Sequence, residues 1–181
     1  MEALDLGFDP VKINVVALRG INDDEIPDFA ELSLSHPFHI RFIEYMPIGT
    51  SDMKSRQILA PEIKDRISSM GRLYPVENTS LDGPAERFKF KNAKGEIGFI
   101  KPISEHFCNS CNRLRLTASG YLKTCLLSDS ETDLKTPLRD GCSDSELADI
   151  ILKAVYKKPF EHPLVANHTG MISGRMSAIG G

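Results

Sequence analysis

The chain has 181 residues, of which 41% are hydrophobic and 26% are charged, and its formal net charge is -3. This composition is typical of a globular protein and excludes an intrinsically disordered chain. No apolar run approaches the length of a membrane span. The small negative charge gives no general attraction for nucleic acid, so any attraction for phosphates must be local. The length fits one domain or a piece of a larger one.

The N-terminal residues MEALDLG have neither the pattern of a signal peptide nor that of an arginine-rich transit sequence. They are typical of the last turn of a helix. Of the four cysteines, three are clustered, which favours a reducing compartment and metal ligation over a framework of disulfides.

The first part of the sequence predicts a β-α-β unit. Residues 11–18 (VKINVVAL) are rich in β-branched side chains, and residues 39–46 (HIRFIEYM) alternate polar and apolar, so both predict strands. Between them, residues 22–34 begin with acidic side chains and continue with apolar side chains at helical spacing, which predicts a helix. Such a unit forms a parallel sheet and is too small to be a complete α/β domain.

The remaining elements are less regular. We expect a loop over residues 47–59, a short amphipathic helix from Pro61 to Met70, and a helix after the capping box that starts at Ser143. Two hairpins are predicted from alternating segments joined by turn residues, at 87–91 with 97–100 and at 114–117 with 121–124.

The most informative motif is C-x2-C-x13-C, formed by Cys108, Cys111 and Cys125. One turn between the first two thiols keeps both sulfurs within reach of a single metal or cluster. One interpretation is a structural zinc site with Cys142 or His106 as fourth ligand. The other, which three thiolates and an open position favour, is a [4Fe-4S] cluster.

Two arginines follow the second thiol. On a strand, Arg113 and Arg115 would project from one face, where they could bind a phosphate or a ring edge. The alternative is an ordinary solvated strand face. Their nearness to Cys111 favours a role at the metal site.

These residues resemble a known family. The segment FCNSCNRLRLTASGYLKTCL (107–126) is similar to the C-terminal cluster motif of the molybdenum cofactor biosynthesis protein A family, which are radical S-adenosylmethionine enzymes with GTP 3′,8-cyclase activity. VKINVV, RGINDDEI, RFIEYMPIG and the Gly-Gly end extend the resemblance over most of the chain, in the family's order.

The resemblance implies a fold and a set of site residues. Residues 1–60 would be the remnant of an incomplete TIM-like (β/α) barrel, and residues 61–181 an α+β region that binds a cluster. Cys108, Cys111 and Cys125 would hold a [4Fe-4S] cluster whose open iron binds the guanine of GTP. The implied GTP contacts are Lys12, Arg113 and Arg115, and the implied S-adenosylmethionine contact is Met46.

Two of these assignments have alternatives. Lys12 could instead be a buried ion-pair partner, and Met46 could be ordinary core packing, although the carboxyl end of a barrel strand is where active sites assemble. The terminal Gly180 and Gly181 resemble the family's double-glycine tail, which reaches into the active site.

The resemblance also implies a reaction. A 5′-deoxyadenosyl radical abstracts hydrogen from the ribose of GTP, and ring closure gives (8S)-3′,8-cyclo-7,8-dihydroguanosine 5′-triphosphate on the route to molybdenum cofactor. No residue of this chain is assigned an acid, base or radical-relay role. The compartment would be the bacterial cytoplasm or, in a eukaryote, the mitochondrial matrix.

One departure from the family is large. The C-x3-C-x2-C motif that binds the cluster that cleaves S-adenosylmethionine is absent from this sequence. We therefore expect a C-terminal portion that does not turn over alone, and whose exposed sheet edges could pair with another chain, for example as a homodimer. The rival interpretations are a structural zinc module and an inactive fragment.

Overall fold

The computed structural model describes residues 1–49, 55–78, 83–162, 172, 173, 176 and 179. The chain divides into two compact units. The first unit comprises Met1–Tyr45 and Met53–His106, and the second comprises Met46–Asp52 and Phe107–Gly181. Among the described residues, no helix combines the length and the apolar character needed to cross a membrane.

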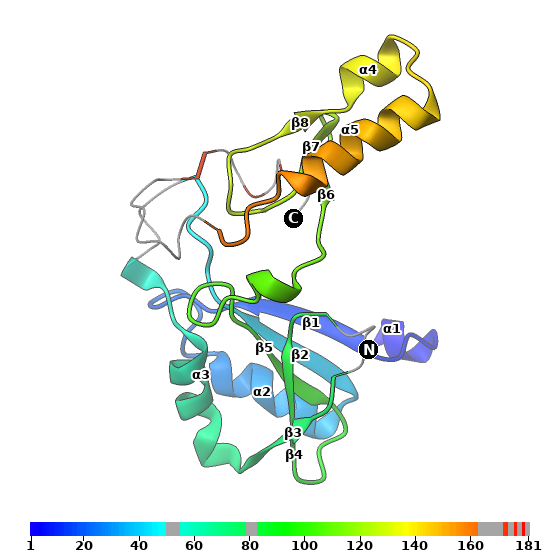
Figure 1. The fold of residues 1–181 in the computed structure, drawn as a ribbon. Helices are drawn as coiled ribbons and strands as arrows, with labels where there is room; N and C mark the ends of the chain where they lie inside the picture. The colour runs from blue at the N-terminus through cyan, green and yellow to red at the C-terminus, as the bar shows by residue number, and fades with distance from the viewer. Residues whose placement is uncertain (50–54, 79–82, 163–171, 174–175, 177–178, 180–181) are drawn as a thin grey trace. The chain divides into compact units, whose positions relative to one another are not determined.

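The first unit is built on a five-stranded mixed sheet (Figure 1). Its strands, in spatial order, are β1 (Val11–Val16), β2 (Phe38–Ile43), β5 (Glu96–Ile100), β4 (Glu86–Phe90) and β3 (Leu73–Val76). The pairs β1 with β2 and β2 with β5 are parallel, whereas β5 with β4 and β4 with β3 are antiparallel. The carboxyl ends of β1, β2 and β5 therefore meet at one edge of the sheet.

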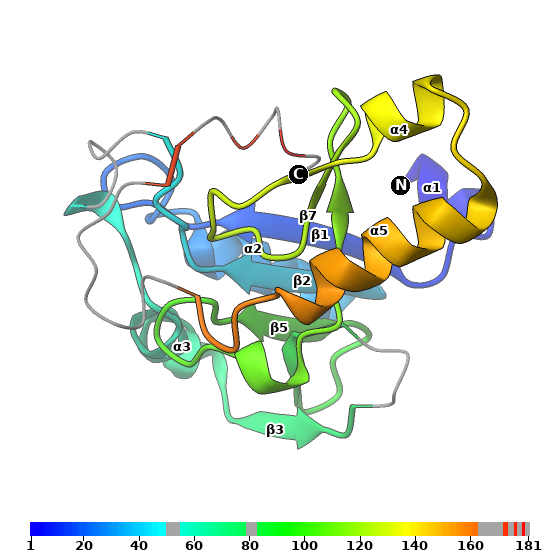
Figure 2. The ribbon, with the colours of Figure 1, turned by 45° about the horizontal axis from the view of Figure 1, so that its top comes forward.

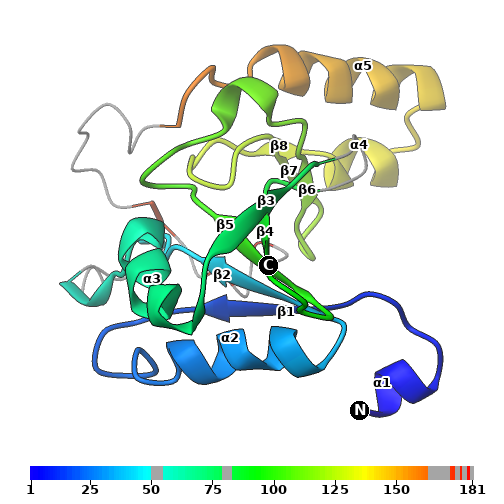
Figure 3. The same ribbon diagram turned by 90° about the horizontal axis from the view of Figure 1, so that it is seen from below.

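Two helices cover one face of this sheet, as Figure 3 shows. They are α2 (Ile26–Ser35) and α3 (Ala60–Ile67), and α3 continues into a short 3-10 turn, η2 (Ser68–Met70); a single-turn helix, α1 (Glu2–Asp5), precedes β1. Alternate residues of each strand point to the helices, because side chains of a strand alternate between its two faces. The resulting core contains Val15, Ile40, Phe42, Ile97 and Phe99 from the strands with Ile26, Ala30, Ile63 and Ile67 from the helices.

The predicted β-α-β unit is confirmed, with corrections at its boundaries. The first strand ends at Val16 instead of residue 18. The helix begins at Ile26 instead of residue 22. The Asn22 and Asp23 side chains accept hydrogen bonds from the backbone amides of Leu18 and Gly20, at 2.8 and 2.6 Å, which stabilise a turn in place of a first helical turn. The second strand ends at Ile43, before the predicted residue 46.

The sequence did not predict β3. This strand contains Pro75, which cannot donate a backbone hydrogen bond. The structure places β3 at the edge of the sheet, the position where a strand tolerates proline. The hairpin predicted over residues 87–91 and 97–100 is confirmed as β4 and β5.

The second unit contains a three-stranded antiparallel sheet of β6 (Arg115–Leu116), β7 (Tyr121–Lys123) and β8 (Thr132–Asp133). Its helices are the 3-10 turn η3 (Cys108–Ser110), α4 (Lys135–Arg139) and α5 (Asp144–Tyr156), with α4 and α5 visible in Figure 2. The predicted capping box is confirmed: the Ser143 hydroxyl accepts from the Glu146 amide, and the Glu146 carboxylate accepts from the Ser143 amide. Helix α5 packs through Leu147, Ile150, Ile151 and Ala154 on Leu122 and Leu134.

A C-terminal segment is also bound into the second unit. Ile172 forms a parallel bridge with Ile48, and its carbonyl accepts a hydrogen bond from Gly49 at 2.9 Å. The Ser173 amide and hydroxyl both donate to the Asp129 carboxylate at 2.8 Å. The predicted Gly180–Gly181 tail lies outside the described residues. The predicted division into residues 1–60 and 61–181 stays a prediction.

Candidate metal centre

The C-x2-C pair lies on a single tight turn. Cys108 begins η3, and the Cys111 amide donates to the Cys108 carbonyl at 3.1 Å. This bond closes the turn, so that the backbone of the two cysteines lies close together. The spacing in the sequence therefore has the geometric effect expected of a ligand pair.

Cys125 follows β7 in the same unit. Burial raises the pKa of the Cys125 thiol; a backbone hydrogen bond from Leu127 opposes this, and the sulfurs of Cys108 and Cys111 nearby raise the pKa further. All four cysteines of the chain carry free thiols, which excludes a disulfide among them in this structure.

The three thiols are neighbours, but they do not form a closed cage. Within the described part of the chain, no three or more His, Cys, Asp or Glu side chains are arranged closely enough to hold a metal ion. This includes the set with Cys142 that a zinc site would need. Partly buried free thiols from two segments of one unit nevertheless suit a thiolate-ligated group, because thiolates are the ligands of both iron–sulfur clusters and structural zinc.

The two arginines lie next to the cysteine turn, but they do not share a strand. Arg115 is the first residue of β6, whereas Arg113 precedes the strand, so the expected common strand face is wrong for Arg113. The Arg113 guanidinium carbon lies 5.2 Å from the centroid of the Phe107 ring, a cation–π contact. This contact holds Arg113 close to the start of the cysteine segment.

Arg115 faces a second cation across the hairpin. It lies directly opposite Lys123 in the β6–β7 register, and the Lys123 ammonium pairs with the Glu131 carboxylate at 3.2 Å. Like charges directly opposite each other destabilise a sheet unless an anion lies near them. The Lys123 side chain is only 3% exposed, so this positive charge is a fixed part of the hairpin.

A third cation, which sequence reasoning missed, contacts the segment after the thiol pair. The Lys158 ammonium donates to the carbonyl oxygens of Cys111 and Arg113 at 2.7 and 3.1 Å, and it lies 3.6 Å from the Cys111 sulfur. The signal in the sequence was the end of a well-capped helix just before Pro159. Nothing in the sequence indicated which segment that helix end would contact.

In the first unit, the sheet face opposite the helices carries the polar side chains of Lys12, Asn14, His39 and Arg41, and we call it the polar face; Gly98 lies on the same face. Lys12 is exposed in this structure. Arg41 lies between Asn14 and Gly98 in the strand register. A Cβ on Gly98 would lie 3.2 Å from the Arg41 Cγ, so the glycine makes room for the Arg41 stem.

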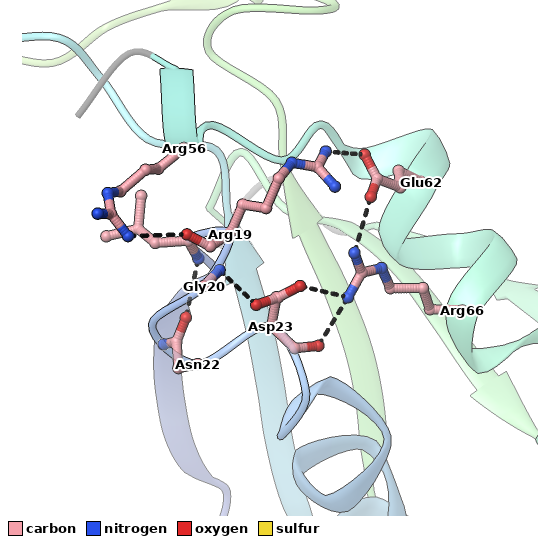
Figure 4. A network of polar contacts seen from close by, with 8 residues as sticks. Arg19, Gly20, Asn22, Asp23, Arg56, Glu62 and Arg66 are labelled. Atoms are coloured by element: carbon pink, nitrogen blue, oxygen red, sulfur yellow. Dashed lines mark hydrogen bonds and ion pairs between the residues drawn. The ribbon is translucent and has the colours of Figure 1, made fainter. Parts of the chain in front are cut away.

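A network of ion pairs fixes the loop that follows β1 (Figure 4). Arg66 of α3 donates to the carboxylates of Asp23 and Glu62 at 3.0 and 2.9 Å, and Arg19 donates to Glu62 at 2.8 Å. These bonds hold the pKa of Asp23 and of Glu62 below their usual values, with the Gly20 amide the largest cause at Asp23 and Arg19 at Glu62. The RGINDD segment is thus tied to α3.

Met46 falls in the second unit with the cysteines and arginines, whereas Lys12 falls in the first. Met46 comes three residues after the end of β2, and its carbonyl accepts a hydrogen bond from the Ile48 amide at 2.8 Å. Its side chain is partly exposed, which differs from a residue of the fully packed core.

Residues 38–164 match the family model described as Molybdenum Cofactor Synthesis C. The chain belongs to the Molybdenum Cofactor Synthesis C family. This match includes all three cysteines of the motif, both arginines after them, Lys158 and β2 with Met46.

Curated relatives carry the name GTP 3′,8-cyclase. The chain is 50% identical over 181 residues to that of Moorella thermoacetica and 46% identical over 182 residues to that of Pelotomaculum thermopropionicum. With that of Crocosphaera subtropica it shares 40% identity over 193 residues. Each alignment covers 99% of this chain and 55%, 55% and 57% of the respective relative. The chain therefore spans about half the length of the curated relatives it matches.

Proposed function

We propose that this chain is the part of a GTP 3′,8-cyclase, a lyase of molybdenum cofactor biosynthesis, that holds a [4Fe-4S] cluster and binds GTP. The observation that carries the proposal is the C-x2-C turn with Cys125 near it and with two arginines following in the same unit. The family match and the names of the relatives support the reaction.

In this proposal Cys108, Cys111 and Cys125 are the cluster ligands. Three thiolates would hold the cluster and leave room for one non-protein ligand, and the cluster would supply the position at which guanine binds. The protein's contribution is to hold the thiols on one short turn and one hairpin end, both fixed by backbone hydrogen bonds and strand pairing.

The remaining substrate contacts come from cations. Arg113 and Arg115 bind the nucleotide beside the cysteines, because a guanidinium can donate two parallel hydrogen bonds to a phosphate. Lys12 of β1 is a further GTP contact in this proposal. Met46 contacts S-adenosylmethionine.

The parallel pair of β1 and β2 supports a further proposal, that residues 1–60 are the remnant of an incomplete TIM-like barrel. In that barrel, strand β1 would gain a neighbour at its free edge. The radical reaction needs a second set of cysteines, which this sequence lacks. We therefore propose binding without turnover for this chain alone.

Anaerobic reconstitution with iron and sulfide tests the cluster. We expect about four irons and four sulfides per chain. The visible spectrum should show the broad absorption that charge transfer from sulfur to iron produces. Cys125→Ser should lower the iron content, whereas Cys142→Ser, which changes a cysteine outside the motif, should leave it unchanged. A colourless protein that retains only zinc would show that the cysteines form a structural zinc module and do not hold a cluster.

Calorimetric titration of the cluster-loaded chain with GTP tests the substrate. We expect saturable binding that is lost in the iron-free chain, because the guanine position is on the cluster. Absence of binding by a fully loaded sample would leave an inactive fragment as the correct interpretation.

A further inference from the structure

The Lys158 ammonium bonds to the backbone on both sides of Asn112. Its hydrogens reach the carbonyl oxygen of Cys111 at 2.7 Å and that of Arg113 at 3.1 Å, and its nitrogen is 3.6 Å from the Cys111 sulfur. These partners belong to the segment that carries a proposed cluster ligand and a proposed nucleotide contact. All of them lie in the second unit.

The position of Lys158 is set by α5. The capping box fixes the start of this helix, and its apolar side packs on Leu122 of β7, the strand that leads to Cys125. At the other end the Lys158 amide donates to the Val155 carbonyl at 3.0 Å, which carries the helical path to Lys158. Figure 2 shows α5 ending near the turn that carries the first two cysteines. The neighbouring Lys157 is exposed, whereas Lys158 is partly buried.

The segment that Lys158 contacts has little structure of its own. Residues 111–114 lie between η3 and β6, outside any described helix or strand. The directions of the Cys111 thiol and of the Arg113 guanidinium therefore depend on hydrogen bonds that side chains distant in the sequence make to this backbone. Hydrogen bonds from a charged donor are the strongest of these, so an ammonium shared by two carbonyls restricts both residues at once.

We propose that Lys158 is a positioning residue of the three-cysteine site. Its ammonium holds the backbone at Cys111 and Arg113, so that one thiol and one guanidinium keep fixed directions, and its positive charge offsets the negative charge of bound thiolates. The role toward cluster and GTP rests on the proposed function. The role in ordering residues 111–114 does not, because it concerns the chain's own backbone.

Three variants of the 181-residue chain test this inference: Lys158→Met, Lys158→Arg and, as the matched control, Lys157→Met. In the metal-free chain, amide hydrogen exchange of the peptide covering residues 108–116 should be about ten-fold faster in Lys158→Met, since a charge-assisted bond is lost. Lys157→Met should exchange like the unaltered chain, and Lys158→Arg should retain most of the protection. Equal exchange in the two Met variants would overturn the inference.

A second readout uses the reconstituted chain. Lys158→Met should release iron to a chelator about ten-fold faster than Lys157→Met, and its cluster should have a more negative reduction potential, because a fixed positive charge favours the reduced state. If the unaltered chain takes up no iron, the proposed function fails while the exchange result still decides the role of Lys158. If the unaltered chain binds iron and GTP and the two Met variants behave alike, only the Lys158 inference fails.

Should Lys158→Met fail to fold, as judged by circular dichroism, Lys158→Gln takes its place, because Gln keeps a neutral donor of similar length. Its exchange should then lie between that of the unaltered chain and that of a peptide without protection. Protection equal to that of Lys157→Met would again overturn the inference.

Discussion

The carboxylate of Glu44 accepts two hydrogen bonds from Ser104, one from its backbone amide at 2.9 Å and one from its hydroxyl. It also accepts from the amides of Ile103 and Ala60, both at 3.0 Å. Glu44 follows β2, Ser104 follows β5, and Ala60 begins α3. One buried side chain, 1% exposed, therefore joins three segments where the parallel strands end.

Replacing this carboxylate should weaken the first unit. We expect Glu44→Ala to lower the free energy of unfolding by about 2 to 4 kcal/mol, because three backbone amides lose their acceptor in a buried place. Chemical denaturation measures the change. Glu105→Ala, which removes a carboxylate that is 67% exposed, should cost much less. Similar losses in both variants would show that Glu44 does not fix the three segments.

Replacing the arginines after the cysteine turn should weaken GTP binding and leave the iron content unchanged. We expect Arg113→Ala and Arg115→Ala each to weaken GTP binding by about ten-fold or more, since a charge-assisted contact to the nucleotide is lost, with iron content unchanged. Arg139→Ala, at the exposed end of α4, serves as the control. Loss of iron together with GTP binding would indicate that these arginines support the fold instead.

Gly95 marks a place where two backbone segments approach closely. A Cβ at this residue would lie 2.1 Å from the Phe38 carbonyl oxygen and 2.7 Å from that of His36, closer than any real contact. We expect Gly95→Ala to destabilise the chain by about 3 kcal/mol or more, because neither backbone atom can move without shifting β2. Thermal unfolding of Gly83→Ala, where the added methyl would meet nothing within 4 Å, provides the comparison; equal effects would contradict the prediction.

His39 should make the fold sensitive to mild acid. Burial lowers the pKa of this imidazole below its ordinary value of 6.5, against an opposing effect of the Glu96 carboxylate. The unfolded chain therefore takes up a proton at a higher pH than the folded chain does, and stability falls as the pH falls below about 6.5.

A neutral replacement should remove part of this dependence. The free energy of unfolding of His39→Asn should change less between about pH 7.5 and pH 5.5 than that of the unaltered chain. Denaturation curves at the two pH values measure the difference. An equally steep pH dependence in His39→Asn would contradict this assignment.

Local patterns predicted most of the elements. The β-α-β unit, both hairpins and the capped helix α5 follow from alternation, helical spacing and a capping box, which act within a few residues. Errors arose where a side chain bonded to a distant or unexpected partner. Asn22 and Asp23 formed a turn instead of a helix start, and Pro75 was placed in an edge strand that only the completed sheet reveals.

The sequence predicted the cysteine ligands of the candidate site, but it did not predict the residues that surround them. The spacing of Cys108, Cys111 and Cys125 was enough to indicate thiolate ligation. Lys158, by contrast, comes from the end of a helix some fifty residues after Cys108, and no sequence pattern relates the two. Contacts of this kind depend on how α5 packs on β7, which is a tertiary property.

The order of the strands in the first sheet bears on how the chain folds. Strands β3, β4 and β5 pair with their neighbours in sequence, whereas the parallel pairing of His39 in β2 with Glu96 in β5 spans α3, β3 and β4. Local pairs close short loops and form early, and long loops are closed late. We therefore expect β4 and β5 to form as a preassembled hairpin that docks on β2 in a slow, rate-limiting step. Glu44, which bonds across that junction to Ser104, should stabilise the product of this step and slow its reversal.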